Sequence, residues 1–239
     1  MDTTQDLVSV MIGVYNAELY VAEAIESVLA QSYEPIELIV VDDGSDDGTA
    51  GIVKSFGDVV RYEYQQRAGN GAARNSAVEL AHGAYFAFLD ADDRFLPNKI
   101  ERQLQVLRQE PAIDAVFGHV REFISPELAS DAAARLRRPA EDAPWMAPNL
   151  MLIRRDSFFR VGPFSTTVRV GVTVDWYARA LEARLGMHLL PEVVLERRLH
   201  AQNNGLRERD SRSQYLHVLK ASLDRRRAAA GQDNESSPT

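Results

Sequence analysis

The 239-residue sequence is 45% hydrophobic and 26% charged, which is enough for one large domain with a sizeable core or for two small ones, and we expect one domain with an appended lobe. It contains no cysteine, and this excludes disulfide bonds and thiolate metal ligands. The formal net charge of −8 argues against a general nucleic-acid-binding protein, whereas nucleotide binding stays compatible because a divalent cation can offset phosphate charge.

Residues 1–6, MDTTQD, lack the basic and then apolar pattern of a secretory segment. No window of the sequence approaches the length of an apolar membrane-spanning helix. We therefore expect a soluble cytoplasmic protein without an integral membrane segment.

Predicted strands and helices alternate along the first ninety residues. Apolar and β-branched runs predict strands at residues 8–12, 38–41, 59–64 and 86–89. Helical periodicity predicts helices between them at residues 19–29, around 52–56 and at 72–81. We expect Gly83 to end the last of these in a left-handed conformation. This alternation predicts an α/β fold with parallel crossovers and a Rossmann-like half of about one hundred residues.

The rest of the chain is less regular. Pro97 suits the first turn of a helix that Pro111 ends, and the proline-rich, basic segment 123–149 is typical of a mobile lid or a substrate-facing insertion. Further elements are expected as a strand at 150–153, helices at 155–160 and 175–185, a strand at 193–199, a charged helix at 211–229 and a disordered polar tail at 231–239.

Two acidic clusters directly follow apolar strands: Asp42-Asp43 and Asp90-Ala91-Asp92-Asp93. The carboxyl ends of parallel strands share one edge of the sheet, where ligands bind in open α/β folds. Asp90 and Asp92 are two residues apart, so their carboxylates share a face if the strand continues, and such oxygens suit Mg²⁺ or Mn²⁺. Alternatively, these acids solvate a turn or cap the helix that follows.

Four motifs in order resemble those of family 2 glycosyltransferases, a likeness that covers most of residues 8–200. They are VSVMIGVYN at 8–16, VVDDGS at 40–45, ARN at 73–75 and DADD at 90–93. The resemblance implies a GT-A fold, a mainly parallel Rossmann-like sheet flanked by helices with a small acceptor-side lobe. It divides the chain into a nucleotide-sugar-binding half at 1–118, an acceptor-side half of the same domain at 119–205, and a C-terminal helix and tail at 206–239.

The resemblance further implies a donor site. Its residues would be Gly13, Tyr15, Asn16, Asp43, Arg74, Asp90, Ala91 and Asp92. Asp43 would accept a hydrogen bond from uracil N3, Tyr15 would lie against the base or ribose, and Arg74 would meet phosphate oxygens. The alternatives are an Asx-type turn at 42–45, a half-buried Tyr15 and a surface Arg74. For Asp42 we favour the structural role. The family more often has Pro-Thr or Thr-Ser at positions 13–14, so any hydroxyl contact there is lost or replaced by backbone.

By the same resemblance, Asp92 is the surest ligand of a Mn²⁺ or Mg²⁺ ion, with Asp90 and His200 as further ligands, although His200 could equally be a surface histidine at a strand end. Asp175 is the expected catalytic base, at a helix start where Val174 replaces the family's usual Glu. The alternative is that Asp175 is a plain N-cap. Trp176 would pack below the sugar or fill the core.

We thus expect an inverting, metal-dependent glycosyltransferase that moves a sugar from a nucleotide diphosphate to a hydroxyl acceptor. UDP is the favoured nucleotide, and the acceptor would be a saccharide, a peptide or a small molecule. One alternative is a non-catalytic member that binds nucleotide or a protein partner. A sugar nucleotidyltransferase is less favoured, because the loop at 13–18 has one glycine and an acid where phosphate would approach.

Overall fold

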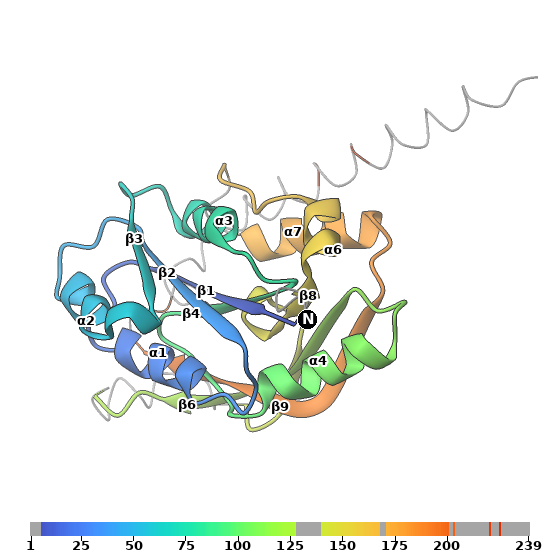
Figure 1. Ribbon diagram of the computed structural model, residues 1–239, viewed down its shortest axis with the longest axis horizontal. Coiled ribbons are helices and arrows are strands. Elements are labelled where there is room, and N and C mark those ends of the chain that lie inside the picture. The colour runs from blue at the N-terminus through green and yellow to red at the C-terminus, as the bar shows by residue number, and fades with distance from the viewer. Residues whose placement is uncertain are drawn as a thin grey trace, which may run out of the picture.

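The computed structural model describes residues 6–127, 140–167 and 171–200 together with Asn203, Lys220 and Arg225. The described strands form one mixed sheet in the order β3-β2-β1-β4-β8-β6-β9-β5, with β7 paired to β6. Helices lie on both faces of this sheet (Figure 1). Among the described residues, no helix has the length and apolar character needed to cross a bilayer.

The N-terminal part of the sheet is parallel. It comprises β1 (Val8–Val14), β2 (Ile36–Asp42), β3 (Arg61–Tyr64) and β4 (Tyr85–Asp90). β1 lies between β2 and β4, with Val14 opposite Asp42 and Gly13 opposite Asp90. This register confirms that the two acidic clusters lie at one edge of the sheet.

Helices of the N-terminal part are α1 (Val21–Leu29), α2 (Thr49–Ser55), η2 (Gly57–Val59), α3 (Asn70–Leu80) and α4 (Lys99–Gln109). In Figure 1, α3 lies on one face of β1 and β2, and α1 and α2 lie on the other. β1 and β4 are almost completely buried, which explains why their sequences are continuous apolar runs rather than alternating ones.

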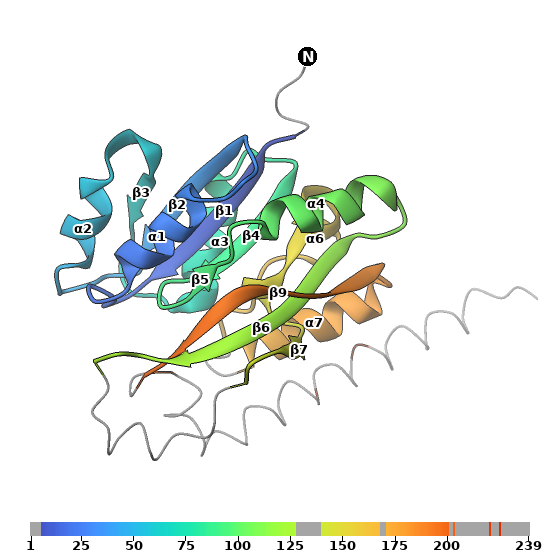
Figure 2. The same cartoon turned by 90° about the horizontal axis from the view of Figure 1, so that it is seen from below.

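The C-terminal part extends the same sheet. Its elements are β5 (Arg94–Phe95), β6 (Ala115–Ile124), β7 (Ala143–Trp145), η3 (Pro148–Leu150), β8 (Leu152–Arg154), α6 (Arg155–Val161), α7 (Val172–Glu182) and β9 (Met187–Leu199). β6 and β9 run parallel to each other over most of their length (Figure 2). The boundary expected at 118/119 falls inside β6, so both halves contribute to one sheet.

Several expected boundaries are wrong. Strand β6 was not predicted, and β7 lies in the segment expected to be a lid, where Ala143–Trp145 pairs with Gly118–Val120 of β6. Helix α4 begins at Lys99, not Pro97, and α7 begins at Val172, not Asp175. Residues 128–139 of the expected lid, most of the expected 211–229 helix and the 231–239 tail lie outside the described residues.

Gly83 does not end α3 in a left-handed conformation, since it is absent from the glycines with positive φ in the described chain. Helix α3 ends at Leu80, followed by an extended Ala81. A Cβ on Gly83 would lie 2.6 Å from the Leu7 carbonyl oxygen and 2.7 Å from Ser9 Oγ. Glycine is therefore required there by the close approach of the β1 backbone.

Helix α4 buries a polar pair that its apolar stripe does not reveal. Lys99 Nζ donates to Gln103 Oε1 at 2.6 Å, and both side chains are fully inaccessible to solvent. Gln103 in turn donates to the carbonyl oxygens of Val116 and Leu150. Burial lowers the pKa of Lys99 from 10.5 to about 7, because the charged ammonium loses its hydration.

We expect this lysine to make the stability of the protein depend on pH. Because the native pKa lies below the unfolded one, the unfolded chain binds more protons between about pH 7 and 10, so the free energy of unfolding rises with pH there. In Lys99→Met this rise should shrink by roughly 1.4 kcal/mol for each unit of pKa shift removed. Urea denaturation between about pH 7 and pH 9.5 measures it. Lys54→Met, on the exposed face of α2, is the control and should keep the wild-type slope; equal slopes in wild type and Lys99→Met would contradict the prediction.

Candidate active site

Asp42 holds the turn that follows β2. Its Oδ1 accepts from the backbone N–H of Ser45 at 2.9 Å, and its Oδ2 accepts from the Tyr62 hydroxyl at 2.9 Å. Asp42 is completely buried. The structural role favoured for this residue is therefore the one that its contacts support.

Asp43 organises the loop before α3. Oδ1 accepts from the Ala68 N–H at 2.8 Å and from Gln65 Nε2 at 2.7 Å, while Oδ2 accepts from the Gly69 N–H at 2.7 Å. The carboxylate thus sits at the carboxyl end of β2 with three donors around it. Two carboxylate oxygens offer about four acceptor positions, so one remains for a further donor.

The loop after β1 is built from the expected donor residues. Tyr15 is 36% exposed, and the Arg67 guanidinium lies 3.6 Å from its ring centroid. Asn16 has a φ of 48° and exchanges two side-chain hydrogen bonds with Asp46, which fix the loop against residues 44–49. A Cβ on Gly13 would lie 3.2 Å from Ala73 Cβ, so glycine lets α3 pack closely on β1.

Arg74 is not a surface residue. It is 5% exposed and its Nη2 contacts Asp90 Oδ1 at 2.5 Å. Asp90 Oδ2 also accepts from Asn149 Nδ2 at 3.3 Å. The structure therefore links the ARN motif of α3 directly to the last residue of β4.

Asp90 and Asp92 do not share a strand face, because β4 ends at Asp90 and the chain then turns. The Asp92 carboxylate instead meets the end of β9: Oδ2 lies 2.9 Å from His200 Nε2 and 3.2 Å from Asn203 Nδ2. His200 is only 6% exposed, so the alternative of a surface histidine is wrong. The structure brings Asp92 and His200 together and gives Asp90 different partners.

Asp93 is a buried member of the acidic cluster at residues 90–93. It was not among the predicted site residues. Its Oδ1 accepts from the Arg198 N–H at 3.0 Å, and its Oδ2 accepts from Asn149 Nδ2 at 2.9 Å. Burial holds the pKa of Asp93 well above its ordinary value, and the neighbouring carboxylates of Asp92 and Asp90 raise it further. The sequence feature that could have identified Asp93 is its place as a third acid directly after Asp90 and Asp92.

Arg198 supports this cluster from inside. Its Nε donates to the Asp92 carbonyl oxygen at 3.1 Å and its Nη2 contacts Glu23 of α1 at 2.7 Å. The guanidinium also lies 4.8 Å from the Tyr20 ring, which itself packs beside the His200 ring with centroids 4.8 Å apart. The positions of Asp92 and His200 thus depend on α1, β4 and β9 at once.

The acidic cluster fits a hard divalent cation in its chemistry. Carboxylate and imidazole are suitable ligands for Mn²⁺, and carboxylate for Mg²⁺. Among the described residues, no three His, Asp or Glu side chains are gathered closely enough to hold a metal by themselves. Such a cation would therefore need oxygens from elsewhere, and Mg²⁺ sites commonly combine one or two carboxylates with substrate phosphates.

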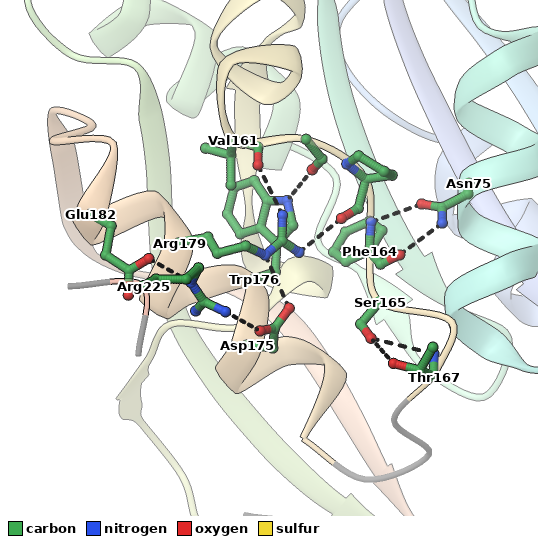
Figure 3. A network of polar contacts seen from close by, with 12 residues as sticks. Asn75, Val161, Phe164, Ser165, Thr167, Asp175, Trp176, Arg179, Glu182 and Arg225 are labelled. Atoms are coloured by element: carbon green, nitrogen blue, oxygen red, sulfur yellow. Dashed lines mark hydrogen bonds and ion pairs between the residues drawn. The ribbon is translucent and has the colours of Figure 1, made fainter. Parts of the chain in front are cut away.

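Asp175 lies in the first turn of α7 but does not cap it (Figure 3). The N-cap is Gly171 in a left-handed conformation, and the Asp175 N–H already donates to the Gly171 carbonyl. Asp175 Oδ2 accepts from Arg179 Nε at 3.0 Å, and Oδ1 lies 3.5 Å from Arg225 Nη1. The N-cap interpretation is therefore wrong, and the carboxylate is held by arginines instead.

Trp176 fills the core. It is 2% exposed, stacks on Phe158 with ring centroids 5.8 Å apart, and donates from Nε1 to the Gly162 carbonyl. The alternative in which its ring lies beneath a sugar is not supported by this burial.

A cavity of about 360 Å³ lies away from these residues. It is lined by residues 82–85 and 154–156, at the amino end of β4, the opposite end of that strand from Asp90. Its arginines Arg154 and Arg155 donate to backbone carbonyls of Ile113 and Ala81. This cavity therefore does not contain the candidate site.

Comparisons with known proteins agree with the geometry. The family model described as glycosyl transferase family 2 matches residues 9–167. An uncharacterized glycosyltransferase of Rickettsia felis is 30% identical over 235 residues, covering 91% of this chain and 38% of the relative. One of Rickettsia typhi is 46% identical over 108 residues, covering 45% of this chain and 34% of the relative. The chain thus spans less than half the length of these curated relatives.

The crystal structure of S. aureus TarS 1–349 in complex with UDP-GlcNAc matches with a TM-score of 0.66 at 17% identity, covering 82% of this chain and 59% of that one. This likeness concerns the fold, a mostly parallel, curled sheet flanked by helices. Together with the family match over residues 9–167, it shows that the chain belongs to glycosyl transferase family 2 and has the GT-A fold.

Proposed function

We propose that this protein transfers a sugar from a nucleotide diphosphate to a hydroxyl acceptor, with a divalent cation and with inversion at the anomeric carbon. The observation that carries the proposal is the parallel register of β2, β1 and β4. It places Asp43 and Asp92, from separate motifs, at one edge of the sheet, where nucleotides bind in such folds.

A uridine nucleotide is the favoured donor. The TarS structures of the same fold were crystallised with UDP and with UDP-GlcNAc. In our chain, Asp43 retains an acceptor position after its three internal hydrogen bonds, and uracil N3–H is a donor of the required kind. The exposed Tyr15 and the Arg67 stacked on it offer an aromatic and a cationic surface next to that carboxylate.

Asp92 and His200 would hold Mn²⁺ or Mg²⁺. When bound, the cation would stabilise the charge that develops on the diphosphate leaving group. Arg74 of α3 adds a buried positive charge beside Asp90. Asp93, Asn149 and Arg198 hold the cluster in place through their hydrogen bonds.

Asp175 is the proposed base. In a single displacement the acceptor oxygen bonds to the anomeric carbon as the bond to the phosphate oxygen breaks, and the acceptor proton passes to a carboxylate. Arg179 Nε orients Oδ2 of Asp175, whereas Oδ1 faces Arg225 at the longer distance of 3.5 Å. We assign the proton to Oδ1, because the weaker contact is the easier one for an acceptor hydroxyl to replace.

A non-catalytic, nucleotide-binding protein is the second candidate. It is favoured by Val174 in place of the usual acid and by the two arginines that engage Asp175. The two candidates differ in whether Asp175 is needed for turnover.

We expect UDP to bind more tightly with Mn²⁺ than without it, and more tightly than GDP or TDP. Asp92→Ala should weaken the Mn²⁺-dependent binding roughly tenfold or more, because a cation ligand is lost. Isothermal titration calorimetry measures both effects. Asp58→Ala removes an exposed carboxylate from η2 and should bind UDP like wild type. Absence of diphosphate binding under every condition would refute the donor site.

Asp175→Asn should lower the release of UDP from UDP-GlcNAc roughly 10²–10⁴-fold, the contribution expected of a general base. Its affinity for UDP and Mn²⁺ should stay at the wild-type level. Asp156→Asn, which changes an exposed acid in the first turn of α6, is the matched control. Turnover that is unchanged in Asp175→Asn would remove Asp175 from the mechanism, and wild-type binding without any turnover would favour the non-catalytic candidate.

A further inference from the structure

Three consecutive polar residues of α3 reach three different parts of the molecule. Arg74 contacts Asp90 at the end of β4. Ser76 donates to Gln65, which in turn donates to Asp43. Asn75, between them, points to the segment before α7. Successive side chains on a helix diverge by about 100°, so consecutive residues of one helix can contact three different parts of the molecule.

Asn75 binds the backbone of one residue twice (Figure 3). Its Nδ2 donates to the Phe164 carbonyl oxygen at 2.9 Å, and its Oδ1 accepts from the Phe164 N–H at 2.9 Å. The residues are 89 positions apart in the sequence. An amide side chain that pairs with both polar groups of one peptide residue fixes the orientation as well as the position of that residue.

Gly71 lies one helical turn before Asn75 and brings the same two segments close together. A Cβ on Gly71 would lie 2.4 Å from the Ser165 carbonyl oxygen, a distance that no side chain could accommodate without movement of the backbone. Residues four apart share one face of a helix. One face of α3 is therefore matched to residues 164–165 both by hydrogen bonds and by shape.

The segment that Asn75 holds is joined to α7. The Phe164 ring packs on the Trp176 ring with centroids 5.9 Å apart, and Trp176 Nε1 donates to the Gly162 carbonyl. Arg179 donates from Nη1 to the Val161 carbonyl and from Nη2 to the Pro163 carbonyl. These contacts connect α7 to residues 161–164, at the end of α6 and directly after it.

The same Arg179 donates from Nε to Asp175 Oδ2. A continuous set of contacts thus runs from Asn75 through Phe164 to Trp176 and Arg179, and ends at Asp175 (Figure 3). Since α3 also carries Arg74, the helix that contacts Asp90 is also linked through these contacts to Asp175.

We propose that Asn75 is a positioning residue: it fixes α7, and with it the Asp175 carboxylate, relative to the donor site on β4. This inference rests on the proposed function for its catalytic consequence, but its structural consequence does not. Loss of the Asn75 contacts displaces Asp175. It leaves in place the loop before α3 that Asp43 organises, because that loop is held through Ser76, Gln65 and Asp43.

The test is Asn75→Asp, which keeps the size of the side chain and replaces the donor facing the Phe164 carbonyl by an acceptor. Amide hydrogen exchange should become faster in peptides covering 158–167 and 171–182 and stay unchanged in those covering 8–14 and 85–90. With UDP-GlcNAc and Mn²⁺, release of UDP into water should fall roughly tenfold to a hundredfold, while UDP affinity should change by less than about twofold.

Asn98→Asp places the same new charge at the exposed start of α4 and is the matched control. If Asn75→Asp does not fold, Gly71→Ala displaces the same segment without a charge and gives the same comparison. Unchanged amide hydrogen exchange in residues 171–182 of Asn75→Asp overturns the inference. A loss of UDP affinity that parallels the loss of turnover overturns it as well. A wild-type protein that releases no UDP refutes the proposed function alone, because the exchange measurement still decides the role of Asn75.

Discussion

The ion pair between the buried Arg74 and the half-buried Asp90 connects the two layers on which the site depends. Asp90 is the last residue of the central strand β4, and Arg74 is on α3, the helix that covers β1 and β2. A guanidinium that is almost completely withdrawn from water needs its partner, since an unpaired charge there would be strongly destabilising. The pair therefore fixes the helix over the strand ends.

The carboxylates of the acidic cluster at residues 90–93 have different partners. Asp92 turns to His200, and Asp93 turns inward to Asn149 and the Arg198 backbone. The raised pKa of Asp93 shows that burial and its acidic neighbours still oppose its ionised form. A cluster under this electrostatic constraint is suited to a cation and to the phosphates that accompany it.

Helix α3 links three separate parts of the molecule. Its side chains contact the acidic cluster, the loop held by Asp43 and the turn that leads to α7. If the proposed donor site and the proposed base act together, their spacing must be fixed to within a fraction of an ångström. In this chain a single helix contacts both the loop held by Asp43 and the turn that leads to α7.

The sequence by itself determined the parallel strands β1, β2 and β4 and the acidic residues at their carboxyl ends, because apolar runs and local turns depend on neighbouring residues. It did not reveal β6, the inward turn of Asp93, the burial of Lys99 or the arginines around Asp175. Those features depend on pairings between residues far apart in the chain, such as Asn75 with Phe164. Only the tertiary structure decides them, because a side chain's partners at such separations are set by packing and not by local pattern.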